Sequence, residues 1–172
     1  YVPMTTKKDA MLLHKNQYFS VYNRNEYYTI EFPFPQVTIL PVIDKEFVLM
    51  VQVKRPVLNG VILELPAGGV EEDENEAEAA LRELHEETGI KVYDKNRFKP
   101  MNSLSVIPGR TPQLLTIFQI DITKEEYESR DMHDDEIAGL KKLSFPDAIN
   151  MILSGEIYVS TPIAILNTYL FS

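Results

Sequence analysis

The sequence predicts an α+β fold in which a mixed β-sheet packs between helices. Runs rich in Val, Ile, Leu and Phe indicate strands within residues 17–65 and 91–143. Apolar residues at helical spacing indicate helices at 75–88, 144–154 and 162–171. No internal repeat, low-complexity tract or linker divides the chain of 172 residues, so we expect a single domain over its whole length.

The composition excludes several classes of function. The net charge of −9 argues against nonspecific nucleic-acid binding, which depends on Lys and Arg to neutralise phosphates. The absence of cysteine excludes disulfides and thiolate chemistry, and three scattered histidines do not favour a zinc site. The apolar runs are too short to span a membrane, and no secretory segment is visible, so we expect a cytoplasmic protein.

Residues 1–35 form the expected N-terminal hairpin region, ahead of a core of residues 36–172. Segments 18–22 and 27–32 are typical of two strands, with 23–25 as the turn between them. The aromatic side chains of this region either pack in a small sheet or a dimer contact, or one of them stacks on a purine ring.

The core begins with strands at 36–43 and 47–54, which are apolar and separated by a short polar turn. A third strand-like run, 61–65, contains Glu64, and a carboxylate is costly to bury without a partner. Glu64 therefore either binds an arginine or contributes to a metal and substrate site. The glycines of segment 66–69 then predict a tight turn, because glycine adopts backbone angles that other residues resist.

The helix expected at 75–88 has both a start signal and a stop signal. Asn75 is the candidate N-cap, and Glu78 stands three residues later, as a capping box requires. Gly89 suits the left-handed position that ends many helices.

One face of this helix is crowded with carboxylates. Its apolar stripe consists of Ala77, Ala80, Leu81 and Leu84. The neighbouring face carries Glu76, Glu83, Glu86 and Glu87. Such a face is either simply solvated or holds a divalent cation, and Mg²⁺ prefers carboxylates together with water and phosphate oxygens. Arg82 can pair with Glu78 or Glu74, which leaves Glu83 and Glu87 without a cation and favours the metal site.

Beyond this helix, segments 98–106 and 114–122 are predicted strands around a loop at 107–112. An acidic loop at 131–136 precedes a further strand at 137–143. Two helices close the chain. Ser144 is the candidate N-cap of the first, and the second opens at Thr161-Pro162.

Segment 68–90 matches the spacing G-x5-E-x7-R-E-U-x-E-E-x-G-U, where U is a bulky aliphatic residue, and thereby resembles the Nudix box. The resemblance implies the α/β/α sandwich of Nudix hydrolases and Mg²⁺ as cofactor, with Mn²⁺ as a substitute. It implies that Glu83 and Glu87 bind metal and that Glu86 binds a second metal or helps to activate water. It also implies a structural pair of Arg82 and Glu74. The carbonyl of Ala67 becomes a further metal ligand.

The run E-L-P-A-G at 64–68 is similar to the ADP-ribose pyrophosphatase branch of the family. That resemblance implies that Arg55 contacts phosphate or the terminal ribose. Pro108 stands close to the position of a proline typical of the branch, and Arg110 beside it can reach a phosphate. In the acidic loop the resemblance makes Glu136 the residue that helps to activate water, with Asp135 as the next candidate.

Together these features predict Mg²⁺-dependent hydrolysis of ADP-ribose to AMP and ribose 5-phosphate by a homodimer. The alternatives are another nucleoside diphosphate sugar or dinucleotide as substrate, or a non-catalytic nucleotide-binding protein. The family's substrates are small molecules, so no nucleic-acid or membrane partner is expected. The resemblance also implies that the N-terminal hairpin packs across the dimer and helps to bind adenine, and the sequence leaves open whether this hairpin is exchanged between subunits.

Overall fold

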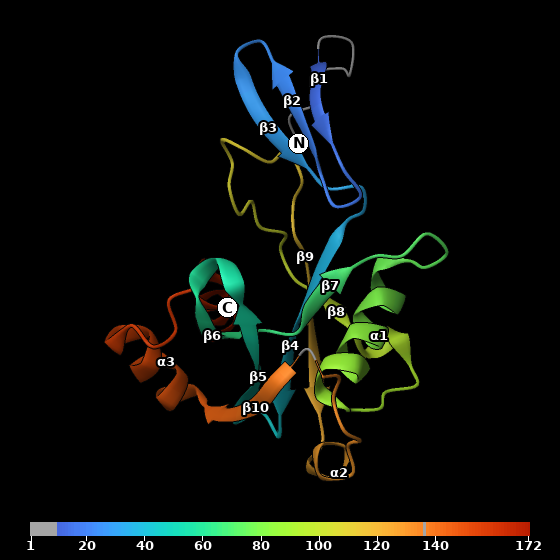
Figure 1. The fold of residues 1–172 in the computed structure, drawn as a ribbon. Helices are drawn as coiled ribbons and strands as arrows, with labels where there is room; N and C mark the ends of the chain where they lie inside the picture. Colours follow the sequence, from blue (N-terminus) through green and yellow to red (C-terminus); the bar gives the residue numbers. More distant parts are fainter. Residues whose placement is uncertain (1–9, 136) are drawn as a thin grey trace.

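The computed structural model describes residues 10–135 and 137–172, which form two β-sheets and the helices around them (Figure 1). The sheet nearest the N-terminus stands apart from a larger sheet that is flanked by helices (Figure 1). Glu136, the candidate for water activation, lies outside the described residues.

The small sheet has three antiparallel strands in the order β1-β2-β3. They are β1 (Ala10–Lys15), β2 (Ser20–Arg24) and β3 (Tyr27–Glu31). The predicted hairpin is present as β2 and β3, and β1 adds a strand that was not predicted. The turn lies at Asn25 and Glu26, whose φ angles of 50° and 72° are those of a tight hairpin turn, so the placement at 23–25 was wrong.

The larger sheet is mixed, as predicted, and has the order β10-β5-β4-β9-β8, with β6 paired to β5 and β7 to β4. Strands β4 and β9 are parallel, and the other pairs are antiparallel. The strands are β4 (Gln36–Ile43), β5 (Phe47–Arg55), β6 (Gly60–Glu64), β7 (Ala67–Gly69), β8 (Lys99–Pro100), β9 (Thr116–Ile122) and β10 (Ile137–Ser144).

The helices include the three that were predicted, and Ser144 caps α3 as expected. They are α1 (Glu76–Thr88), α2 (Lys124–Glu128), α3 (Phe145–Ser154) and α4 (Ser160–Leu170), with short 3-10 helices η2 (Pro56–Leu58) and η3 (Lys95–Arg97). Helix α2 was missed, although Thr123 and Glu126 form a capping box that the sequence displays. None of the helices described here is long and apolar enough to cross a membrane.

The two faces of the larger sheet bury separate clusters, because side chains alternate along each strand. On β4, Ile39 and Ile43 pack with Leu84 of α1. The alternate residues Leu40 and Val42 pack on the opposite side, in the cluster that contains residues of α3 and α4. Helices therefore cover both faces, and the predicted α/β/α sandwich is confirmed (Figure 1).

Two local predictions were wrong. The strand expected at 98–106 is reduced to the two residues of β8 and an isolated bridge between Leu104 and Leu115. Proline and small polar residues interrupt that segment, and they favour irregular structure over a ladder. Segment 67–69 is not a tight turn but β7, which pairs with β4, and none of its residues has a positive φ.

Gly89 is required at the end of α1 for two reasons. Its φ of 73° is left-handed, and an added Cβ would lie 2.1 Å from the carbonyl oxygen of Asp131. We expect Gly89→Ala to lower the free energy of unfolding by about 2 kcal/mol or more, because strain and a backbone clash add. Urea unfolding followed by circular dichroism measures the loss. The exposed Gly109 has no atom within 4 Å of an added Cβ, so Gly109→Ala is the control. Equal midpoints for the two variants would contradict this account.

Candidate active site

Helix α1 presents its carboxylates to β7 because of how its ends and its apolar face are held. The Asn75 side chain accepts hydrogen bonds from the N–H groups of Ala77 and Glu78, and Glu78 reaches back to the N–H of Asn75, so the predicted capping box is confirmed. The residues of α1 that are buried against the core are Ala79, Ala80, Leu84 and Thr88. Ala77 and Leu81, which the periodicity placed in the stripe, are only partly buried.

Arg82 is the hub of the carboxylate cluster. Its guanidinium donates to Glu74 at 2.6 Å, to Glu83 at 2.7 Å and to Glu86 at 2.9 Å, and also to the carbonyl of Gly69 at 2.8 Å. The structural pair with Glu74 is therefore present. These carboxylates raise the pKa of Arg82 well above its usual range, so the guanidinium stays charged.

The prediction that Glu83 lacks a cation was wrong, because Arg82 contacts it directly. Glu78, the alternative partner for Arg82, pairs with Lys95 at 2.6 Å. The rigid fork of five N–H donors explains how one arginine serves several carboxylates, which residue spacing alone does not reveal.

Gly68 makes room for the carboxylate of Glu83. A Cβ at this position would lie 1.8 Å from the Glu83 Oε1 atom and 2.1 Å from its Cδ. The glycine is therefore needed for the close approach of β7 to α1, and not for an unusual backbone angle as the sequence suggested. Burial raises the pKa of Glu83, and the neighbouring Arg82 opposes that rise.

Glu87 is the carboxylate that the protein neutralises least. Its Oε2 accepts a hydrogen bond of 2.9 Å from the N–H of Ala67. Burial, reinforced by the charges of Glu83 and Glu64, raises the pKa of Glu87 to about 8, against the opposing effects of that hydrogen bond and of Arg55. Arg55 therefore offsets the burial of this carboxylate only in part, and a bound divalent metal would supply the remaining positive charge.

The candidate ligands fit a hard divalent cation by their chemistry. The Glu87 carboxylate accepts a hydrogen bond from the N–H of Ala67, and the Glu83 carboxylate lies against Gly68. Arg82 bonds to both Glu83 and Glu86 and so links Glu86 to this group. Among residues 10–135 and 137–172, no three His, Asp or Glu side chains are already gathered as a metal site. Arg82 bonds to Glu83 and Glu86 through one nitrogen and so keeps these two carboxylates close to each other. The Ala67 carbonyl as a ligand stays a prediction.

The side chains of Arg55, at the end of β5, and Glu64, at the end of β6, bond to each other although the strand register pairs Arg55 with Gly60 and Glu64 with Val51. The Arg55 guanidinium donates to both carboxylate oxygens of Glu64, at 2.8 Å and 2.9 Å. Of the two alternatives for Glu64, the structure contains the arginine pair. Glu64 also lines a cavity with Ala67, so this pair stands beside the carboxylate cluster. A contact of Arg55 with substrate stays a prediction.

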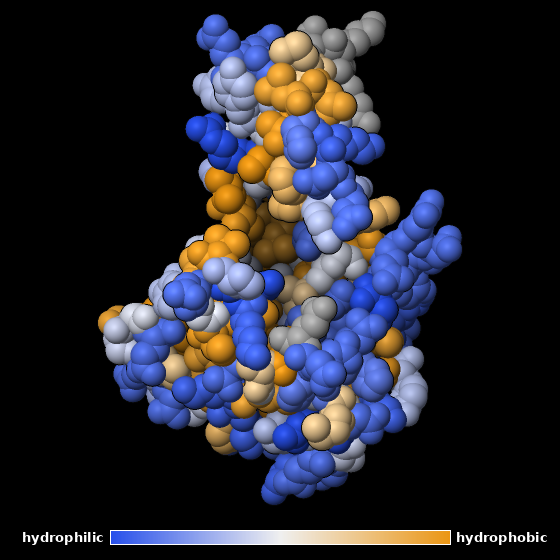
Figure 2. All heavy atoms as spheres, viewed as in Figure 1, coloured by the Kyte–Doolittle hydropathy of each residue, from blue (hydrophilic) through white to orange (hydrophobic). Residues whose placement is uncertain are grey.

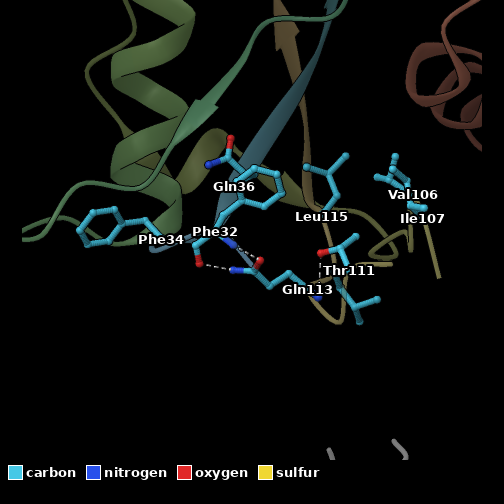
Figure 3. Close-up of a pocket in the computed structure, with 9 residues that line it drawn as sticks. Phe32, Phe34, Gln36, Val106, Ile107, Thr111, Gln113 and Leu115 are labelled. Atoms are coloured by element: carbon cyan, nitrogen blue, oxygen red, sulfur yellow. Dashed lines mark hydrogen bonds between the residues drawn. The ribbon is translucent and has the colours of Figure 1, made fainter. Parts of the chain in front are cut away.

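Two adjoining cavities lie near the carboxylate cluster, and Ala67, whose N–H bonds to Glu87, lines one of them. The cavity beside Ala67 and Glu64 has a volume of about 190 Å³. A more apolar cavity of about 200 Å³ is lined by Phe32 and Phe34 together with the loop that precedes β9 (Figure 3). Both cavities share the wall residues Gln36, Val106 and Leu115. Figure 2 shows a hollow with hydrophobic walls at this place, between the small sheet and the rest of the molecule.

Sequence reasoning found part of this wall. The aromatic segment that includes Phe32 and Phe34 was a candidate for stacking on a purine. Gln36, Val106 and Leu115 were missed, because nothing in their local pattern separates a cavity wall from an ordinary strand or loop.

The acidic loop is attached to the C-terminal end of α1. The N–H of Asp131 donates to the carbonyl of Gly89 at 2.8 Å, and the N–H of Asp134 donates to the carbonyl of Glu86 at 2.9 Å. Lys91 pairs with the Asp131 carboxylate at 2.6 Å. The described part of this loop, including the exposed Asp135, therefore lies beside the helix that carries the carboxylate cluster.

Pro108 and Arg110 lie in the loop that borders the aromatic cavity. The Arg110 side chain donates to the carbonyl of Gly109, its neighbour in the chain, at 2.9 Å. In the described part of the chain, neither Pro108 nor Arg110 lines the two cavities. Their contact with a substrate stays a prediction.

Comparison with known proteins identifies the family. A family model described as the NUDIX domain matches residues 33–157. The chain belongs to the Nudix family. It is 30% identical over 122 residues to an ADP-ribose pyrophosphatase of Bacillus subtilis, a match that covers 71% of this chain and 64% of that relative. It is 28% identical over 124 residues to a methanol dehydrogenase activator of Bacillus methanolicus, covering 72% of this chain and 65% of the relative.

A shorter match is with an ADP-sugar pyrophosphatase of Mus musculus, which is 44% identical over 59 residues, or 32% of this chain and 27% of the relative. The chain thus spans less than two thirds of the length of the relatives it matches.

Proposed function

We propose that this Nudix protein hydrolyses the pyrophosphate bond of a nucleoside diphosphate derivative, with ADP-ribose giving AMP and ribose 5-phosphate as the first candidate. The observation that carries the proposal is that the aromatic cavity shares walls with a second cavity lined by Ala67, the residue whose N–H bonds to Glu87 of the carboxylate cluster. Such a site suits a ligand with a flat apolar base at one end and phosphates at the other. The ADP-ribose pyrophosphatase among its relatives supports the same substrate class.

The residues proposed to hold Mg²⁺ are Glu83, Glu86, Glu87 and the carbonyl of Ala67, with Mn²⁺ as a substitute. When bound, the metal supplies charge neutralisation for the two phosphates and acidifies water at the site. Arg82 keeps the carboxylates oriented, because its bond to Gly69 ties them to β7.

Water activation is assigned to the end of α1 and the loop attached to it. Glu86 lies half-exposed at this end, and the backbone of Asp134 is bonded to its carbonyl. We propose that Glu136 or Glu86 takes the proton of the attacking water, with Asp135 as the next candidate. The leaving phosphate departs in line with that attack.

The other proposed contacts with the substrate come from residues in or beside the two cavities. Arg55 is proposed to bind phosphate or the terminal ribose, oriented by its two bonds to Glu64. The nucleobase is proposed to occupy the cavity of Phe32 and Phe34. Pro108 and Arg110 in the neighbouring loop remain candidates for contact with the substrate.

A homodimer in the cytoplasm is part of the proposal. The exposed apolar residues of the small sheet, which include Met11, Leu12, Tyr27 and Tyr28, support an interface there. The molar mass in solution, from light scattering, tests the dimer.

The function is tested with a panel of ADP-ribose, other nucleoside diphosphate sugars and dinucleotides, incubated with Mg²⁺ and analysed by mass spectrometry. We expect AMP and ribose 5-phosphate from ADP-ribose at the highest kcat/KM. Faster cleavage of another substrate would favour the alternative specificity. Tight binding without any cleavage would favour a non-catalytic nucleotide-binding protein.

A further inference from the structure

The side chain of Gln113 joins two segments that are 81 residues apart in sequence. Its Oε1 atom accepts a hydrogen bond of 2.7 Å from the N–H of Phe32, and its Nε2 atom donates one of 2.8 Å to the Phe32 carbonyl (Figure 3). Close by, the N–H of Ile30 donates to the carbonyl of Arg110 at 2.7 Å. The loop before β9 is therefore fastened to the end of β3.

The primary amide of Gln113 takes the place of a neighbouring strand. β3 ends at Glu31, so the next residue, Phe32, has no partner of its own in the small sheet. An amide side chain offers one acceptor and donors in the geometry of a peptide group, and it satisfies both backbone groups of Phe32. A residue whose N–H and C=O groups are both hydrogen-bonded is held in one backbone conformation, which a hydrophobic contact alone does not achieve.

These bonds cross the aromatic cavity from one wall to the other. Phe32 and Phe34 belong to the wall that follows β3, whereas Ile107, Gln113 and Leu115 belong to the loop wall. Phe32 is 42% exposed, so packing alone leaves it partly unsupported. The Gln113 amide, together with the backbone bond between Ile30 and Arg110, therefore fixes how far apart the two walls of the cavity lie.

We propose that Gln113 is a positioning residue that holds Phe32 in place for the nucleobase, and so sets the affinity for the nucleoside part of the substrate. This inference rests on the proposed function for the location of the base. Gln113 has no contact with the carboxylate cluster among its hydrogen bonds in the described residues, so the chemical step does not depend on it.

The test combines binding of adenosine, followed by NMR titration, with kinetics on ADP-ribose. Gln113→Ala removes both bonds to Phe32. We expect it to weaken adenosine binding and to raise KM about tenfold. This factor lies within the range measured when an aromatic residue that stacks on a base is itself removed. We expect kcat to stay within about twofold. Gln113→Glu keeps the acceptor for the Phe32 N–H but loses the donor, and we expect an intermediate effect.

The control is Gln119→Ala, which removes a glutamine that bonds only to Asp121 through its side chain in the described structure and lines neither cavity. This variant should leave the affinity for adenosine and the KM for ADP-ribose unchanged. Unchanged adenosine binding and KM in Gln113→Ala overturn the inference, and so does a parallel fall of kcat with the melting temperature, which indicates a general structural role. Failure of the wild type to bind adenosine overturns it as well. If the wild type binds adenosine in a Gln113-dependent manner but cleaves nothing in the panel, the inference stands and the proposed hydrolysis fails.

Discussion

Replacing Glu87 with glutamine is expected to lower hydrolysis about a thousandfold while it stabilises the metal-free protein. A metal ligand contributes several kcal/mol of charge stabilisation in the transition state, and about 1.4 kcal/mol corresponds to a factor of ten. Glutamine keeps an oxygen that can accept the 2.9 Å bond from the N–H of Ala67, so the local fold should persist. The loss of activity then reports the missing charge and not a damaged core.

The stabilisation follows from the raised pKa of Glu87. In the metal-free folded protein this pKa is about 8, whereas the ordinary value is 4.5. Between these values the folded protein binds the proton and the unfolded chain has lost it, so stability falls as pH rises through this window. Glutamine removes that dependence. Its variant should be more stable than the wild type at pH 8 by up to about 4 kcal/mol, at about 1.36 kcal/mol per pKa unit, which raises the melting temperature by roughly 10 °C.

Calorimetry with and without Mg²⁺ separates the two effects. Mg²⁺ should raise the melting temperature of the wild type more at pH 8 than at pH 6, because binding must displace the proton of Glu87 at the lower pH. The variant should respond less to Mg²⁺ at both values. The matched control is Glu125→Gln on the exposed side of α2. Equal activity of the Glu87 variant and the wild type would falsify the metal assignment.

Adding one methyl group at Gly68 is expected to weaken the apparent affinity for Mg²⁺ by about 10–100-fold. The new Cβ would lie 1.8 Å from the Oε1 of Glu83, so this carboxylate must swing away and break its bond to Arg82. Displacing the groups that orient a metal ligand costs affinity of this order. Because Glu83 is a side chain with several rotatable bonds, the fold itself should survive the change.

Activity measured across a range of Mg²⁺ concentrations checks this prediction for Gly68→Ala. We expect a shifted half-saturation point with near-normal circular dichroism. Gly60→Ala is the control, because its Cβ meets only the carbonyl oxygen of Leu58, at an ordinary 3.8 Å. Gly69→Ala should lie between the two, since its Cβ comes within 3.3 Å of the Gln36 amide. An unchanged Mg²⁺ dependence in Gly68→Ala would show that Glu83 does not need its present position.

The metal-free site and a metal-bound one differ in what neutralises the carboxylates. In the metal-free protein the single positive charge of Arg82 is shared by Glu74, Glu83 and Glu86, and the raised pKa of Glu87 favours its neutral, protonated form. A divalent cation held by Glu83, Glu86 and Glu87 would supply the positive charge that these carboxylates still lack. The cluster is therefore tolerable without metal and yet chemically suited to bind it.

The sequence by itself determined the features that depend on neighbours in the chain. The bounds of β4, the capping box of Asn75 and Glu78, and the left-handed Gly89 were all predicted and are present. Each results from local periodicity or from a side chain bonding to backbone within one turn, so a short window contains the necessary information. The spacing of the carboxylates on α1 likewise indicated the family, because all of the fixed positions lie within one short segment, 68–90.

Only the tertiary structure decided which groups meet across the fold. The close approach of β7 to α1 explains why Gly68 must be glycine, and the reach of Arg82 decides that it contacts Glu83. The bonds between Gln113 and Phe32 depend on a loop folding back over 81 residues. Such contacts arise from the packing of separate elements against a common sheet, and no local pattern encodes the distance between two elements.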